Sequence, residues 1–150
     1  MAEHPATKAA MAYVRQTGLP IPTQAPGPEP HWPANMADLV DQELSHQLGW
    51  YAAQVAYAGY QVALADVERT SYEAEVKVNS TRCFLQATGN VTERREAAKG
   101  NPAVIAAGER LDVHTARYKL LSAIFSGYEA RYKALSRELT RRDQSLRRGT

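Results

Sequence analysis

Two side chains near the start of a predicted long helix have the spacing of half a metal site. Glu43 and His46 form a Glu-x-x-His pair, which helical di-iron proteins use twice together with two further inward-facing glutamates. The second long helical segment offers only Glu109, Asp112 and His114, and their order and spacing do not match that pattern. We therefore interpret Glu43 as a carboxylate of the first helical turns beside a surface histidine, and we predict no metal site.

The single cysteine is the other candidate for reaction chemistry. Cys83 is flanked by Arg82 and Phe84, and no residue that would activate a thiol lies at a diagnostic spacing, so a partly buried structural thiol is favoured over a nucleophile. One cysteine permits neither an intrachain disulfide nor a Cys-based metal cluster. The sequence also contains no Gly-x-x-x-x-Gly-Lys-Ser/Thr loop for nucleotide hydrolysis. These observations favour a protein that is not an enzyme and has no cofactor.

Basic side chains are concentrated in the second half of the chain. Residues 1–75 carry three basic and nine acidic side chains, a net charge of −6, whereas residues 76–150 carry fifteen and seven, a net charge of +8. Such an asymmetry favours a polyanionic partner or head-to-tail self-association. The plain alternative is a solvated helix face that is basic.

Two groups of these cations are candidates for contacts with nucleic-acid phosphates. One group brackets the predicted turn between the long helices and consists of Lys77, Arg82, Arg94, Arg95 and Lys99. The other lies in the C-terminal segment RYKALSRELTRRDQSLRR and consists of Arg131, Lys133, Arg137 and Arg141. Such side chains bind the phosphate backbone without reading sequence. There is no zinc-finger spacing, helix-turn-helix pattern or RNP-like strand, so recognition of a duplex sequence is disfavoured.

The elements that position these residues are predicted to be long amphipathic helices. Heptad steps of four and three connect Leu44, Leu48, Tyr51, Val55, Ala58, Val62, Ala65, Tyr72 and Val76 in one segment, where only Arg69 interrupts the apolar series, and Leu111, His114, Tyr118, Leu121, Phe125, Tyr128, Tyr132, Leu135, Leu139, Arg142 and Leu146 in another. We predict long helices over residues 36–88, capped by Asn35, and 102–147. A short helix over 92–99, capped by Thr92, lies between them. The fold class is all-α, an antiparallel hairpin of the two long helices with the short helix at the turn.

A second apolar stripe on the first helix predicts self-association. One partner helix cannot cover both this stripe and the heptad seam, so we expect a homo-oligomer, either a helical bundle or a ring. The stripe contains Tyr57, Tyr60, Leu64, Val67, Ala74 and Val78. The tyrosines at heptad positions of the second helix are expected to pack in the core and not to stack on bases.

The N-terminal third has a different character. We divide the chain into an arm over residues 1–33 and a helical domain over residues 34–150. Pro5 is expected to open a short helix that ends before Gly18, and a proline-rich linker follows. This linker is either mobile, which we favour, or packs Ile21 and Trp32 onto a neighbour.

The sequence also bears on location. The first residues contain no apolar stretch of a secretory signal, and no run approaches the ~20 apolar residues of a membrane span. We expect a cytoplasmic protein without a membrane partner.

From about Tyr60 to Arg142, a little over half of the chain, the sequence resembles the UvsY-type recombination mediators of tailed phages. The segment EVKVNSTRCFLQATGN is similar to the family's long helix with a basic stretch and a Gly-containing loop, with Lys77 and Arg82 in place of DNA-contacting residues. The segment RLDVHTARYKLLSAIFSGYEARYKALSRE is similar to its second long helix. The resemblance implies a ring-shaped oligomer in the host cytoplasm that binds single-stranded DNA, displaces the single-strand-binding protein and loads a RecA-like recombinase.

Two functional hypotheses follow from the sequence. The first is a recombination mediator that binds single-stranded DNA. The second is a coiled-coil scaffold or adaptor protein with no nucleic-acid role, in which the basic end is solubilising or contacts the acidic half. Salt-sensitive binding to DNA distinguishes the two hypotheses.

Overall fold

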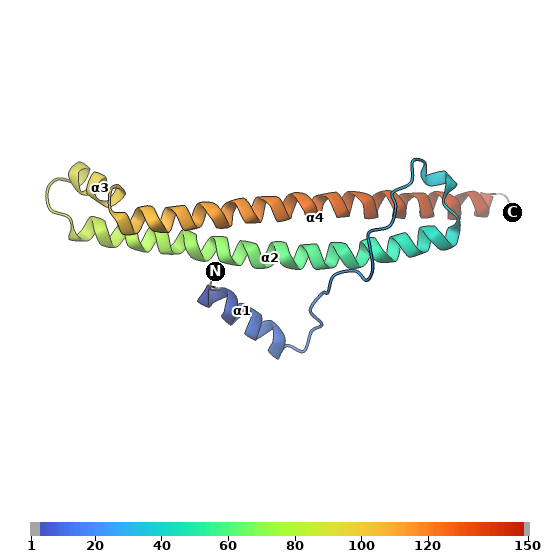
Figure 1. Ribbon diagram of the computed structural model, residues 1–150, viewed down its shortest axis with the longest axis horizontal. Helices are drawn as coiled ribbons and strands as arrows, with labels where there is room; N and C mark the ends of the chain where they lie inside the picture. The colour runs from blue at the N-terminus through green and yellow to red at the C-terminus, as the bar shows by residue number, and fades with distance from the viewer. Residues whose placement is uncertain (1–3, 149–150) are drawn as a thin grey trace. The chain divides into compact units, whose positions relative to one another are not determined.

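The computed structural model describes residues 4–148 and consists of helices joined by short loops and one long extended segment (Figure 1). In chain order the helices are α1 (Pro5–Gln16), the 3-10 helix η1 (Met36–Asp38), α2 (Asp41–Gln86), α3 (Val91–Lys99) and α4 (Pro102–Arg148). No strand occurs in this described range. The predicted all-helical class is therefore confirmed.

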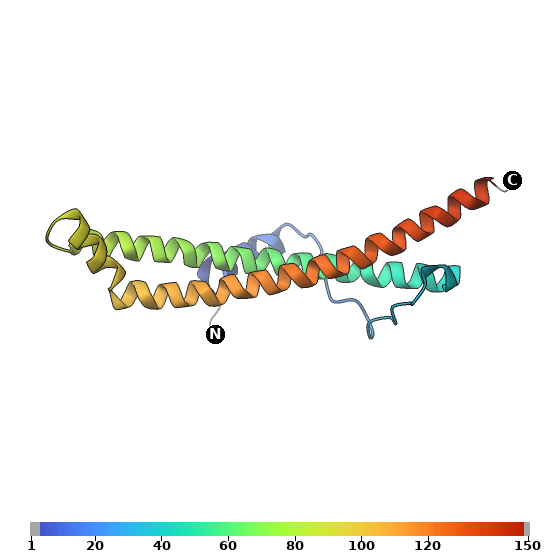
Figure 2. The same cartoon turned by 90° about the horizontal axis from the view of Figure 1, so that it is seen from above.

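The chain divides into two compact units, and each long helix contributes to both. Unit 1 comprises the N-terminal residues through Leu19 together with Val62–Leu120, and unit 2 comprises Pro20–Gln61 together with the residues from Leu121 onward. In both views of the ribbon, the segments of α2 and α4 that belong to unit 1 lie side by side, with α3 between the end of α2 and the start of α4 (Figure 2).

Within each unit the two long-helix segments run antiparallel. In unit 1, Arg110 pairs with Glu75 at 2.7 Å and Arg117 pairs with Glu68 at 2.7 Å, so residue numbers rise along α4 as they fall along α2. In unit 2, the same order follows from the Arg142–Asp41 ion pair at 2.7 Å and the contact between the Tyr128 and Tyr51 rings.

Unit 2 contains the large apolar core of the protein. Its buried members are Ala25, Leu39, Leu44, Trp50, Tyr51 and Leu135, and Trp32, Met36, Leu48, Ala53, Tyr128 and Tyr132 pack against them. Trp32 and Trp50 both meet the Tyr51 ring edge to face, at centroid distances of 5.7 and 5.0 Å. Such aromatic arrangements add stabilisation beyond burial alone.

The proline-rich linker is packed against α2 in unit 2. The Ala25 amide donates to Gln54 Oε1 at 3.1 Å, Gln47 Nε2 donates to the His31 carbonyl at 3.2 Å, and Tyr51 Oη donates to the Glu29 carboxylate at 3.0 Å. Burial and the hydrogen bond to Glu29 raise the pKa of the Tyr51 hydroxyl. In the structure the linker is therefore packed against α2 of its own chain. The mobility of the linker in solution stays a prediction.

Unit 1 has a core of small and polar side chains. Its buried residues are Thr7, Ala65, Glu68, Ala98, Ala107 and His114. α1 belongs to this unit and is capped by His4, whose Nδ1 accepts from the Ala6 amide at 3.2 Å. The His4 ring meets the Tyr72 ring edge to face at 4.9 Å, and Tyr72 stacks on His114 at 4.3 Å. α1 starts at Pro5 and ends before Gly18, as the sequence predicted.

The first long helix begins later than predicted. Asn35 caps η1 instead, because its side chain accepts from the Ala37 amide at 3.2 Å and donates to Asp38 at 3.1 Å. Leu39 then has an extended backbone and is buried in the core of unit 2, so α2 starts at Asp41. α2 also ends at Gln86, two residues before the predicted end.

Glycine and asparagine residues fix the turn between α2 and α4 in unit 1. Gly89 has a positive φ of 105°, a conformation that other residues rarely adopt. Asn90, and not the predicted Thr92, caps α3, and the Glu93 carboxylate accepts a hydrogen bond from the Asn90 amide at 2.8 Å, which completes a capping box. Asn101 caps α4 at the predicted Pro102 start, where its Oδ1 accepts from the Ala103 amide at 2.9 Å.

Candidate nucleic-acid interface

The best-defined cationic surface lies on unit 1, on the last turns of α2. Lys77, Thr81 and Leu85 follow each other at intervals of four residues, so they share one helix face, and Val78 and Arg82 flank them. All five side chains are exposed. Leu85 and Val78 are 68% and 54% exposed, which leaves apolar side chains among the cations.

α3 adds two further cations to this surface. Arg95 and Lys99 are four residues apart and lie together on the exposed side of α3. Arg94 has a different role, because its Nε donates to the Phe84 carbonyl at 3.0 Å and its guanidinium lies 4.3 Å from the centre of the Phe84 ring. Arg94 therefore joins α3 to the end of α2, and its predicted phosphate contact competes with this packing.

Three adjoining shallow hollows connect these side chains into one surface. Thr81 lines all three hollows, Lys77 lines two of them, and Ser80 also lines two. We call this the Thr81 surface and define it by Lys77, Val78, Ser80, Thr81, Arg82, Phe84, Leu85, Arg95 and Lys99. The sequence predicted its cations, but it gave no reason to single out the hydroxyls of Ser80 and Thr81.

The charge on the Thr81 surface is only partly neutralised. Lys99 pairs with Glu96 at 2.9 Å, whereas Lys77, Arg82 and Arg95 have no carboxylate partner among residues 4–148. The acidic side chain beside the hollows, Glu73, is paired with Arg69 at 3.2 Å. Cations without a partner on an open surface are available to a polyanion.

The C-terminal group of predicted cations lies in unit 2 and is mostly paired within the chain. Arg131 forms an ion pair with Glu29 and lies over the Trp32 and Tyr51 rings at 5.5 and 5.9 Å. Lys133 pairs with Glu129 at 3.0 Å. Arg137 is exposed and has no ion-pair partner in the described part of the chain.

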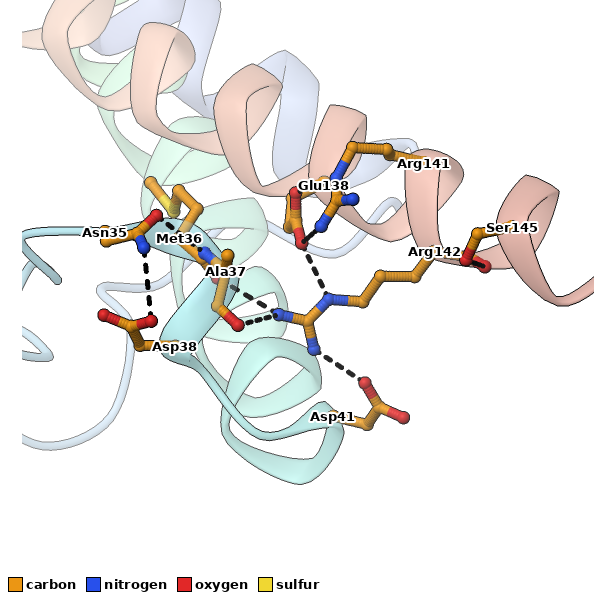
Figure 3. A network of polar contacts seen from close by, with 9 residues as sticks. All are labelled: Asn35, Met36, Ala37, Asp38, Asp41, Glu138, Arg141, Arg142 and Ser145. Atoms are coloured by element: carbon orange, nitrogen blue, oxygen red, sulfur yellow. Dashed lines mark hydrogen bonds and ion pairs between the residues drawn. The ribbon is translucent and has the colours of Figure 1, made fainter.

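Arg141 belongs to a polar network that joins α4 to the start of α2 (Figure 3). Arg141 and Arg142 both donate to the buried carboxylate of Glu138, at 2.7 and 2.8 Å. Arg142 also donates to Asp41 at 2.7 Å and to the Met36 carbonyl at 3.1 Å. The hydrogen bonds from the two arginines lower the pKa of Glu138 from 4.5 to about 2.

A second polar cluster, which sequence reasoning missed, is buried in unit 1. Glu68 accepts from Arg117 at 2.7 Å, and His114 Nδ1 lies 3.2 Å from the same carboxylate oxygen, Oε2. That approach lacks hydrogen-bond geometry, so Nδ1 is buried without a hydrogen-bond partner. The heptad pattern assigned His114 to a seam, and only the antiparallel packing shows that Glu68 faces it.

The other candidates from the sequence are not assembled into a site. Glu43 and His46 are exposed, and Cys83 is half-buried. In the part of the chain that the structure describes, no three His, Cys, Asp or Glu side chains are grouped as a metal ion requires. None of the described helices combines the length and the apolar character needed to cross a membrane.

No known protein family, curated protein or solved structure matches this chain.

Proposed function

We propose that this protein binds single-stranded DNA through the Thr81 surface of unit 1. The observation that carries the proposal is the convergence of Lys77, Arg82 and Arg95 from two helices onto adjoining hollows, without carboxylate partners among the described residues. Each such cation can neutralise one phosphate and release a condensed counterion. Binding of this kind is electrostatic and independent of sequence.

The side chains between the cations favour a single strand over a duplex. The Thr81 and Ser80 hydroxyls can donate to phosphate oxygens, and the exposed Leu85 and Val78 side chains offer apolar contacts to unpaired bases. A flexible strand can follow hollows on a curved helical surface, whereas the phosphates of a duplex have fixed positions. Aromatic stacking contributes little here, because Arg94 covers the Phe84 ring. Affinity should therefore depend steeply on salt.

The wider role that we propose follows the family resemblance in the sequence. In this role α2 and α4 form one antiparallel hairpin, and several copies associate. The oligomer displaces a single-strand-binding protein and loads a RecA-like recombinase. The antiparallel contacts found separately in unit 1 and unit 2 support the hairpin.

The proposal is tested by fluorescence anisotropy with a labelled single-stranded oligonucleotide and a duplex of equal length, at low and at moderate salt. We expect the single strand to bind more tightly, and Lys77→Ala/Arg82→Ala to weaken binding about tenfold, since each lost phosphate contact removes a counterion-release term. The charge-matched control is Lys8→Ala/Arg15→Ala, which removes two exposed cations of α1 outside the Thr81 surface. The control should bind like the unaltered protein.

No binding at low salt by the folded protein would overturn the proposal. The function would then be that of a helical scaffold or adaptor, in which the exposed cations contact acidic protein surfaces. Equal weakening by the control variant would also contradict the assignment of the site.

A further inference from the structure

In unit 1, α4 carries a second heptad seam that is exposed to solvent. Ala106, Glu109, Val113, Ala116 and Leu120 follow each other in steps of three and four, and all five are exposed. The two larger apolar side chains of this seam are mostly exposed to solvent, Val113 at 54% and Leu120 at 68%. Heptad spacing keeps a seam turned toward one partner helix along its length. This outer seam has no such partner in the described chain.

The inner seam of the same helix is already used. In this segment it consists of Leu111, His114 and Tyr118, which are buried or half-buried. His114 stacks on Tyr72 of α2, and Tyr118 lies beneath the Arg69 guanidinium at 5.3 Å. The outer seam is therefore an additional surface of α4.

The charges beside the outer seam make it complementary to itself. Asp112 and Lys119 occupy the same flank one heptad apart, and neither has an ion-pair partner within residues 4–148. On the other flank, Arg110 and Arg117 are already paired with Glu75 and Glu68 of their own chain. The free charge thus changes from negative to positive along one flank. Antiparallel pairing of this flank with its copy places Asp112 of one chain near Lys119 of the other.

We propose that the outer seam of α4 in unit 1 pairs antiparallel with the same seam of a second copy of this chain. When Val113 of one copy meets Ala116 of the other, Asp112 of each copy lies opposite Lys119 of the other, which gives two symmetric ion pairs. The alanines allow the helices to approach closely, and the Leu120 side chains fill the space beside them. A parallel pair would bring Asp112 toward Arg117, whose charge is committed to Glu68.

This interface is independent of the Thr81 surface, because the two share no residue. It also differs from the second stripe of α2, on which the sequence-based prediction of an oligomer rested. Failure of DNA binding therefore says nothing about this interface, and failure of self-association says nothing about DNA binding.

Charge reversal tests the interface by sedimentation velocity over a range of concentrations, with circular dichroism to show that each variant is folded. Asp112→Lys and Lys119→Asp each place two like-charge contacts in the interface, and each alone should weaken self-association about tenfold or more. An equimolar mixture of the two variants should restore it, because every contact is again between opposite charges. Lys8→Asp, on α1, is the control for a change of net charge and should associate like the unaltered protein.

Restored association in the mixture cannot come from misfolded variants, so this result would establish both the face and the antiparallel orientation. A protein that stays monomeric at about 100 µM, where even a weak specific dimer of micromolar affinity assembles, would overturn the proposal. Self-association that neither reversal weakens would place the interface elsewhere, and single variants that dissociate without rescue on mixing would contradict the antiparallel pairing.

Discussion

At the scale of single residues, the cations of this chain occur in two physical situations. Lys77, Arg82 and Arg95 are exposed and form no ion pair with a carboxylate in the described chain, so a polyanion displaces only water and counterions from them. Arg131 and Arg142, in contrast, hold parts of unit 2 together through ion pairs. Sequence spacing identifies both kinds as basic residues near a helix end or on a helix face. Only the position of Glu29 and Asp41, 102 and 101 residues away in the chain, distinguishes them.

The Glu138 network predicts a specific dependence of stability on pH. Because the pKa of Glu138 is lowered to about 2 in the folded protein, its ionised form stabilises the fold above its ordinary pKa of 4.5. This contribution is lost as the pH falls from 4.5 toward 2. Glu138→Gln cannot titrate, so its melting temperature should be lower than that of the unaltered protein above pH 4.5, and the difference should shrink below that pH. Thermal unfolding by circular dichroism from pH 6 to pH 2.5 measures this. A difference that is constant across the range would contradict the assignment.

At the scale of elements, the sequence located the helices well and their first residues less well. Heptad periodicity and the Gly-Asn and Gly-Asn-Pro turns predicted α2, α3 and α4 to within a few residues. The predictions of Asn35 as the cap of α2 and of Thr92 as the cap of α3 were wrong, because the local backbone geometry that selects a capping side chain is not specified by composition. The buried Leu39 has an extended backbone before α2, which delays the start of that helix. The reciprocal hydrogen bonds between Asn90 and Glu93 start α3 at Val91, one residue before the predicted start.

The capping box of α3 gives a test that separates the two candidate caps. Asn90→Ala should lower the free energy of unfolding by about 1 kcal/mol, because the Thr92 and Glu93 amides lose their acceptor. Thr92→Ala should change it by less than about 0.5 kcal/mol, since Thr92 is exposed within the first turn. Urea unfolding of both variants provides the measurement. A larger loss for Thr92→Ala would favour the cap predicted from the sequence.

At the scale of the whole molecule, the chain combines two units with different cores. Unit 2 buries Leu, Trp and Tyr side chains and covers them with the proline-rich linker, whereas unit 1 buries alanines, Glu68 and His114. Heptad periodicity predicts the seams of both units. It does not predict that their cores differ in composition, because it does not show which linker residues pack against α2. The cationic part of the candidate interface was predictable from composition. Its division into a free group on unit 1 and a largely paired group on unit 2 was not, because pairing depends on contacts distant in sequence.

The central claim, that the free cations of the Thr81 surface bind phosphates, is tested most directly by the salt dependence of binding. The slope of log affinity against log salt for a single-stranded oligonucleotide counts the phosphates neutralised, at about 0.7 for each. The triple variant Lys77→Gln/Arg82→Gln/Arg95→Gln should therefore reduce the magnitude of this slope by about 2. The charge-matched control Lys8→Gln/Arg15→Gln/Arg148→Gln should leave the slope unchanged. A slope that is equal in the triple variant and in the unaltered protein would contradict the account, even if the affinity were lower.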